Sequence, residues 1–220
     1  VKRIVSVFVL SFFLTACGAT LVAPQAVSIS TPLSLVVLGD SISAGQYLPA
    51  SSAAFPYVLA TELHAGLTVY AASGNTAAQT RGMYTGILAP MYTVIELGTN
   101  DYNRSITLAT FAATYHSIVT SIVPATRVVC LSVWDPANSA DAVWSFPKGL
   151  PSPVNHVKAS PSAYNAIIEK SCRGKYLSVQ SIYDTHSYHG SGSPGRLYHP
   201  NVAGDSAIAW LIDAAFTSFA

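Results

Sequence analysis

Residues 33–43 read Leu-Ser-Leu-Val-Val-Leu-Gly-Asp-Ser-Ile-Ser. A short apolar run of this kind, rich in valine and leucine, is typical of a strand that is buried on both faces. The run ends at Gly39, and in open α/β sheets the residues that touch ligands lie just beyond the carboxyl ends of the strands. Ser41 is therefore a candidate nucleophile, beside a glycine that permits an unusual backbone angle. Gly-Asp-Ser also suits an ordinary turn before a helix, so other parts of the sequence must decide between a nucleophile and a structural turn.

The rest of the chain alternates between short apolar runs and segments with helical periodicity. Helices are expected at residues 55–65, 108–123, 163–172 and 200–219, the last with a proline at its first helical position. Further strands are expected at residues 67–71, 92–97, 127–133 and 176–183. Strands that alternate with helices form βαβ units with right-handed crossovers, so the pattern predicts an α/β fold with a parallel sheet covered on both sides.

The composition restricts the classes of function. The 220 residues fit one domain, and half of them are apolar. The formal net charge is +1, with no long run of either sign, so nothing favours nucleic acid as a partner, and a neutral small substrate or an uncharged polymer fits better. The sequence has no Gly-x-Gly-x-x-Gly or Walker motif, and Ser43 stands where a Gly-x-Ser-x-Gly elbow needs glycine.

The first seventeen residues have the pattern of an export signal. Lys2 and Arg3 precede an apolar stretch that is too short to span a bilayer comfortably. The following Leu-Thr-Ala-Cys resembles the lipoprotein signal of bacteria, in which cleavage precedes a cysteine that then carries lipid. We therefore expect residues 1–17 to be a signal peptide ending at Cys17, residues 18–32 a tether, and residues 33–220 a domain anchored to the cell envelope through lipid on Cys17. Ordinary signal-peptidase cleavage nearby is the alternative.

Two cysteines remain once Cys17 is assigned to the anchor. An oxidising compartment outside the cell would allow a disulfide between Cys130 and Cys172. Cys130 lies in an apolar run and Cys172 near an expected helix end, so two separate buried thiols are an equal alternative. The sequence leaves both options open.

Polar residues follow the ends of several expected strands. An acyl-transfer site needs a nucleophile, a base, and donors directed at the oxygen that becomes negative. Ser41 would attack, and His199, just before the last helix, would be the base. Gly74 offers a backbone N–H with no side chain in the way, and Asn100 offers an uncharged side-chain N–H. Together with the N–H of Ser41, these groups would form a three-donor oxyanion hole.

These residues resemble the sequence blocks of the SGNH hydrolases, also called GDSL-type esterases. The first block matches Gly39-Asp40-Ser41, the second the glycine of Ser73-Gly74-Asn75-Thr76, the third Gly98-Thr99-Asn100-Asp101, and the fifth His199-Pro200-Asn201 with Gly204. Their order and spacing run from Leu35 to the last helix. The resemblance implies a flavodoxin-like, three-layer α/β/α fold with about five parallel strands, and hydrolysis of esters through an acyl-serine without a metal.

One position departs from the family pattern. Family members usually carry aspartate three residues before the histidine, where it orients the imidazole, but this chain has Arg196 there. Asp184, at the end of the last expected strand, is the nearest acidic replacement upstream, while Asp205 on the last helix is expected to point elsewhere. A backbone carbonyl could instead accept the Nδ1 proton of His199 and leave a Ser–His dyad, which we rank slightly above Asp184.

A metal site is the less favoured interpretation of the histidines. Asp184, His186, His189 and His199 could be taken as a metal cluster, yet the Gly- and Ser-rich loop among them is a poor rigid frame. Solvated loop histidines are the preferred interpretation. We therefore expect neither a metal nor another cofactor.

The longest stretch without a clear period is residues 134–160, which is long for a plain connection. We expect it to be a functional loop or a lid. Its tryptophans Trp134 and Trp144, together with Tyr188, would either line a substrate groove or pack on the flank of the domain.

The predicted function is that of a serine esterase acting on small acyl esters, with acetyl groups on a carbohydrate as one candidate. The ordered set Ser41, Gly74, Asn100 and His199 carries this prediction, and we expect a monomer. The alternative is a surface-anchored carbohydrate- or ligand-binding protein that keeps the fold with weakened catalysis. Arg196 is the reason for considering it.

Overall fold

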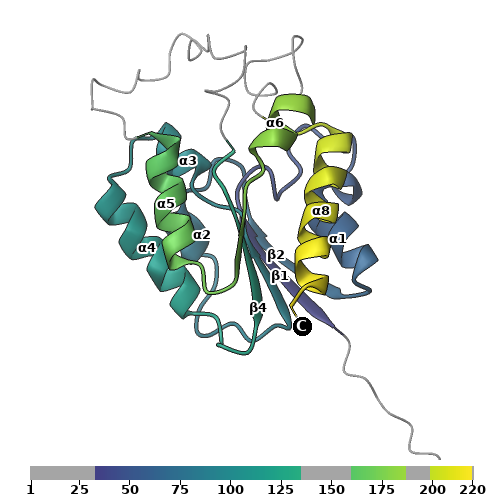
Figure 1. Ribbon diagram of the computed structural model, residues 1–220, viewed down its shortest axis with the longest axis horizontal. Coiled ribbons are helices and arrows are strands. Elements are labelled where there is room, and N and C mark those ends of the chain that lie inside the picture. Colours follow the sequence, from purple (N-terminus) through teal and green to yellow (C-terminus); the bar gives the residue numbers. More distant parts are fainter. Residues whose placement is uncertain (1–32, 135–159, 187–198, 220) are drawn as a thin grey trace, which may run out of the picture. The chain divides into compact units, whose positions relative to one another are not determined.

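The computed structural model describes residues 33–134, 160–186 and 199–219 (Figure 1). This part of the chain holds a parallel sheet with the strand order β2-β1-β3-β4-β5. The strands are β1 (Ser34–Gly39), β2 (Gly66–Ala71), β3 (Tyr92–Ile95), β4 (Arg127–Leu131) and β5 (Lys175–Leu177). The order is that of flavodoxin-like folds and confirms the predicted α/β/α architecture. The expected signal peptide and tether lie outside the described residues.

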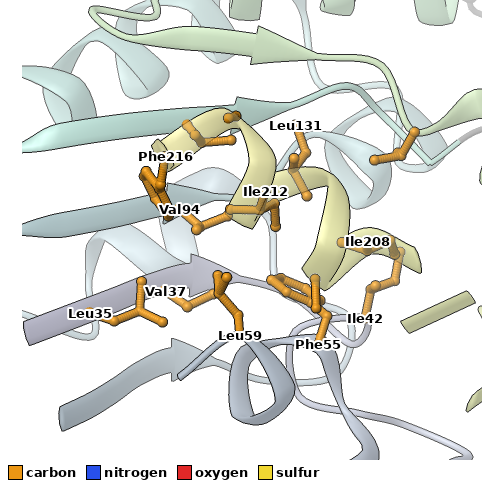
Figure 2. Close-up of a cluster of buried hydrophobic side chains, with 14 of the residues drawn as sticks. Leu35, Val37, Ile42, Phe55, Leu59, Val94, Leu131, Ile208, Ile212 and Phe216 are labelled. Atoms are coloured by element: carbon orange, nitrogen blue, oxygen red, sulfur yellow. The ribbon is translucent and has the colours of Figure 1, made fainter. Parts of the chain in front are cut away.

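One face of the sheet is covered by α1 (Phe55–Glu62) and α8 (Val202–Thr217), with α6 (Gln180–His186) beside α8 (Figure 1). A single 3-10 turn, η1 (Ser51–Ala53), precedes α1. Leu35 and Val37 point from β1 to this face, where burial of each large apolar side chain contributes roughly 1.5–3 kcal/mol. Figure 2 shows them packed with the fully buried side chains of Leu59, Phe55, Ile212 and Phe216.

The other face is covered by α2 (Ala77–Arg81), α4 (Leu108–Thr120) and α5 (Pro161–Ser171), and the short α3 (Thr99–Asn103) lies on the same side (Figure 1). The alternate residues of β1, Val36 and Leu38, pack here against Phe111 and Tyr115 of α4. Because both faces of β1 are covered, every one of its side chains from Leu35 to Leu38 is buried. This explains the unbroken apolar run that opens the domain.

The strand predicted over residues 176–183 is present as β5, but its predicted extent was wrong beyond Leu177. The strand β5 ends at Leu177, and the chain turns into α6. The N–H of Val179 leaves the sheet and donates to the Ser132 hydroxyl at 3.0 Å, while the Val179 carbonyl accepts the N–H of Tyr183 and so opens the helix. The apolar spacing of residues 179, 182 and 183 is helical, and that signal could have identified the helix.

The last helix begins two residues later than predicted. Asn201 is its N-cap and accepts the N–H of Gly204 at 2.9 Å, so Pro200 precedes the cap and does not occupy the first helical position. The helices α2 and α3 were not predicted, because five residues are too few to show a period. Among the helices of the described residues, none has the length and apolar character that crossing a membrane requires.

Trp134 is buried in the core and contacts Tyr183 in an edge-to-face arrangement with 5.0 Å between ring centroids. It therefore packs within the domain and does not line an open groove. The remainder of the expected loop or lid, with Trp144, lies outside the described residues, as does Tyr188.

Cys130 and Cys172 form a disulfide, with their Cα atoms 6.1 Å apart. Cys130 is fully buried on β4, and Cys172 ends α5. The bond therefore ties the centre of the sheet to the helix that covers it. Of the two options that the sequence left open, the structure contains the disulfide.

Replacing both cysteines with alanine is expected to lower the free energy of unfolding by roughly 3–4 kcal/mol, because the bond closes a loop across 42 residues in the unfolded chain. Urea unfolding of the oxidised protein, the reduced protein and the double variant measures this. Reduced wild type is the matched control, since it keeps both side chains. If alkylation of the denatured, unreduced protein labels both cysteines, the bond does not exist.

Candidate active site

Ser41 and His199 meet at the carboxyl end of the sheet. Ser41 lies in the turn after β1, and His199 lies just before α8. The Ser41 Oγ and the His199 Nε2 are 2.9 Å apart, a hydrogen-bond distance, although 158 positions separate the two residues in the chain. His199 is buried and Ser41 is half-buried. The two side chains predicted to be the nucleophile and the base are therefore in contact.

The turn that carries Ser41 is held by Asp40, whose Oδ1 accepts the N–H of Ile42 at 3.0 Å. Gly39 is required here for space. A Cβ at this position would lie 1.9 Å from the Ser43 Oγ, which no side chain could tolerate. The sequence had suggested an unusual backbone angle at Gly39, but its φ is not positive. The correct reason is the close approach of Ser43.

Asn100 lies in the first turn of α3, directly after β3. Its Nδ2 donates to the Asp40 Oδ2 at 2.9 Å, which brings the amide next to the turn that carries Ser41. Gly98 makes this position possible, because its φ of +122° is strained for any other residue and a Cβ would crowd Val133 and Phe111. One amide hydrogen of Asn100 has no partner among the described residues.

Gly74 lies in the turn after β2 with φ +78°, a left-handed conformation that favours glycine. Its carbonyl accepts a hydrogen bond from the Arg104 Nη2 at 2.7 Å, which ties the turn to the end of α3. Within the described part of the chain, the backbone N–H groups of Gly74 and Ser41 make no hydrogen bond. The two predicted backbone donors therefore remain available.

Buried carboxyl groups surround these residues. Burial raises the pKa of Asp40 to about 6, an effect that the hydrogen bond from Ile42 reduces. Glu96, which follows β3, has a pKa well above its usual value because of burial and the neighbouring charge of Asp40. Asp101 accepts the N–H of Ala77 at 2.9 Å, and burial raises its pKa to about 6. Asp40 bonds local backbone, whereas Asp101 bonds across to α2.

Sequence reasoning missed Glu96 and Ser43. Glu96 is the acidic residue in the run predicted as a strand at residues 92–97, and it is only 3% exposed. A charged residue within a buried strand needs partners. That contradiction was the signal that could have identified it.

The third member of the predicted site is not where the sequence suggested. Asp184 lies in α6 and not at the end of a strand, because β5 stops at Leu177. The side chain of Asp184 is outside what the structure describes, as is Arg196. Asp205 is fully buried, and its Oδ1 accepts the N–H of Phe55 at 2.8 Å, so it caps the start of α1 as a residue outside the site.

Tyr47 flanks the base. Its ring meets the His199 ring edge to face, with 4.9 Å between centroids, and its φ of +69° is unusual for a residue other than glycine. Strained backbone of this kind clusters at functional sites. Among the described residues no group of three or more His, Cys, Asp or Glu side chains could hold a metal, and His189 lies outside them.

The chain belongs to a known family of ester hydrolases. The model of the GDSL-like Lipase/Acylhydrolase family matches residues 37–207, which is most of the chain. The family and the three-layer fold together define the protein as an SGNH-type ester hydrolase. No curated protein sequence matches it significantly.

Solved structures with this fold share little sequence with the chain. The psychrotrophic esterase EstA from Pseudoalteromonas sp., inhibited by monoethylphosphonate, is 16% identical with a TM-score of 0.57 over 84% of this chain and 97% of that one. A carbohydrate esterase family 2 enzyme with a carbohydrate-binding domain, from Corynascus thermopiles, is 16% identical with a TM-score of 0.52 over 86% and 68%. A carbohydrate esterase whose active site displays divergent catalytic and non-catalytic binding functions is 16% identical with a TM-score of 0.54 over 86% and 70%. These likenesses show the fold.

We expect Asp205→Asn to change how stability depends on pH. Burial raises the pKa of Asp205 from 3.8 to about 8, and no described residue donates a hydrogen bond to its Oδ2. The folded protein therefore holds this proton more tightly than the unfolded chain, so the contribution to stability is full below pH 4 and is lost as the pH rises to 8. From pH 5 to 7, the free energy of unfolding of the wild type should fall by roughly 2–3 kcal/mol relative to the variant.

Urea unfolding of both proteins at several pH values measures this difference. Asp40, Glu96 and Asp101 also have raised pKa values, but both proteins contain them, so the difference isolates Asp205. If the free energies of unfolding of the two proteins change with pH in the same way, the pKa of Asp205 is not raised and the prediction is wrong.

Proposed function

We propose that the protein is a serine esterase in which Ser41 is the nucleophile and His199 the general base. The single observation that carries the proposal is the 2.9 Å hydrogen bond between the Ser41 Oγ and the His199 Nε2. A serine hydroxyl is a weak nucleophile until an adjacent base takes its proton. The contact provides that base, and membership of the GDSL-like family supports the same reaction class.

The proposed reaction has two halves. In the first, the Ser41 hydroxyl gives its proton to the His199 Nε2 as its Oγ attacks the ester carbonyl, and the imidazolium then protonates the departing alcohol. In the second, His199 takes a proton from water, which attacks the acyl-serine and releases the acid. Ser41 and His199 return to their starting states, and the net reaction is hydrolysis of one ester.

Three donors would stabilise the tetrahedral intermediates. They are the backbone N–H groups of Ser41 and Gly74 and the second N–H of the Asn100 amide, all without partners within the described residues. Hydrogen-bond donors fixed around a developing oxyanion contribute more to the rate than any other single group in many enzymes, about 2.7–4 kcal/mol each. Asp40, Glu96 and Asp101 accept hydrogen bonds from other groups, so they do not compete with the oxyanion for these three donors.

The substrate that we propose is a small acyl ester, with acetyl groups on a carbohydrate as the first candidate. The support is the likeness in fold to two carbohydrate esterases. The rival proposal is a surface-anchored binding protein with weakened catalysis. Arg196 motivates it, because the family pattern has aspartate at this position.

We predict that Ser41→Ala and His199→Ala each lower kcat for a short-chain p-nitrophenyl ester by at least about 10³-fold, because either change removes the activated nucleophile. An organophosphonate probe should label Ser41 in the wild type and label it far more slowly in His199→Ala. Equal hydrolysis by wild type and Ser41→Ala would remove the esterase proposal. Absence of labelling at Ser41 would favour the binding protein.

The partner of the His199 Nδ1 is proposed to be a backbone carbonyl, which leaves a Ser–His dyad. On this proposal Asp184→Asn keeps kcat within about tenfold of the wild type. Loss of an orienting carboxylate costs about 10⁴ in kcat in a serine protease triad. A fall of that size would assign the role to Asp184.

We also infer that the protein is exported and anchored by lipid on Cys17. The support is the signal pattern at residues 1–17 together with the disulfide between Cys130 and Cys172, since disulfides persist mainly in oxidising compartments. Lipid on one residue with several acyl chains would hold the domain at a membrane surface.

The full chain expressed in a bacterial host should incorporate radiolabelled palmitate and fractionate with membranes. Cys17→Ser should abolish both, while Cys172→Ser serves as the cysteine control and should retain the label. Label that persists in Cys17→Ser would contradict the anchor.

A further inference from the structure

Glu96 is a buried carboxyl group that the proposed reaction does not use. It lies beneath residues 40–43, the turn that carries Ser41 and is called the nucleophile turn below. Glu96 follows β3 and is 3% exposed. Its Oε2 alone accepts three hydrogen bonds, from the Asp40 N–H at 3.2 Å, the Ser43 N–H at 3.3 Å and the Ser43 hydroxyl at 2.8 Å. In the chain, Asp40 lies directly before Ser41, and Ser43 lies two residues after it. One oxygen of Glu96 therefore holds both sides of the turn that presents the nucleophile.

The second carboxyl group in this cluster belongs to Asp40, which is fully buried. Its oxygens accept the Ile42 N–H and the Asn100 amide, at 3.0 and 2.9 Å. The side chains of Asp40 and Glu96 also hydrogen-bond to each other. Within residues 33–134, 160–186 and 199–219, no basic side chain pairs with either group.

Two carboxyl groups can hydrogen-bond only if one of them carries a proton. With both ionised, like charges would face each other out of water, which is strongly unfavourable. The other titratable groups that act on the pair are Asp101 of α3, which repels charge on Asp40, and the Tyr115 phenol of α4, which is near Glu96. Neither supplies positive charge. One proton held between the two carboxyl groups removes this repulsion and makes their mutual hydrogen bond possible.

We propose that Glu96 is a positioning residue that shares one proton with Asp40: its Oε2 accepts from the nucleophile turn, and the shared proton joins its carboxyl group to that of Asp40. Asp40 in turn holds the Asn100 amide. The protonated pair thus connects the proposed nucleophile and the proposed oxyanion donor. The role rests on the proposed function, because it concerns the placement of Ser41 and Asn100.

The neutral form of glutamate has a close structural equivalent in glutamine. A glutamine side chain at position 96 keeps an acceptor oxygen for the turn and has an N–H that can donate to Asp40. Leucine has a similar volume but satisfies none of these groups. Glutamine would preserve the proposed network, and leucine would break it.

The test compares Glu96→Gln with Glu96→Leu in the intact protein, by kcat and KM for a p-nitrophenyl ester. Glu96→Gln should keep kcat within about threefold, and Glu96→Leu should lose about 10² in kcat with little change in KM, the size of effect seen when an oxyanion donor is misplaced. If Glu96→Gln loses as much as Glu96→Leu, an ionised carboxylate is required and the proposal is wrong. If both variants keep full activity, the placement of Ser41 and Asn100 does not depend on Glu96 and the proposal is wrong.

A second measurement does not depend on activity or on the leucine variant folding. Infrared difference spectroscopy of wild type against Glu96→Gln at pH 7 should show the C=O stretch of a protonated carboxyl group in the wild type only. Asp101 and Asp205 are common to both proteins and cancel. Absence of this band would overturn the proposal, whatever the outcome for Ser41→Ala. Conversely, the band together with normal hydrolysis by Ser41→Ala would remove the proposed function and leave the pair with its shared proton.

Discussion

The arrangement of the site depends on one hydrogen bond that joins the beginning of the domain to its end. The Ser41 Oγ and the His199 Nε2 come within 2.9 Å only because β1 lies inside the sheet and α8 packs back across β1 and α1. Asp205 fixes α8 to the start of α1 through the Phe55 N–H. Gly204 lets α8 approach α6, since a Cβ there would lie 2.7 Å from the His186 carbonyl. His199 is therefore positioned by contacts that lie outside the proposed reacting groups.

The polar groups behind Ser41 show how a buried turn can be kept in one conformation. The N–H groups of Asp40, Ile42 and Ser43 all donate to carboxyl groups, and these acceptors directly follow the central strands β1 and β3. Burial of carboxyl groups is costly unless they are neutral or hydrogen-bonded. Here the hydrogen bonds are numerous, so the cluster can be rigid although no basic side chain pairs with it among the described residues. A rigid turn is what a nucleophile and its oxyanion donors require.

Much of this arrangement could be predicted from the sequence. The apolar run before Gly39 indicated a central strand, and parallel strands bring their carboxyl ends to one edge, so the approach of Asn100 to the turn that carries Ser41 followed from the order of the strands. The hydrogen bond from Asn100 to Asp40 that makes this approach was not predicted. The role of Glu96 could not be predicted, because its partners are 53 and 56 positions away and only the folded chain brings them together. Helix α6 was missed for a related reason, since the Ser132 hydroxyl that diverts Val179 from the sheet belongs to the end of β4. Local pattern determines single elements, while contacts between elements determine where each one stops.

The central claim is that the Ser41 hydroxyl becomes acylated during turnover. It is tested most directly by mixing the protein with p-nitrophenyl acetate, quenching with acid within the first turnovers, and analysing the peptide that contains residue 41 by mass spectrometry. The account predicts an acetyl group on Ser41 that disappears as the ester is consumed. Steady hydrolysis with an acetyl group on another residue, or with no acylated intermediate on any peptide, would contradict it.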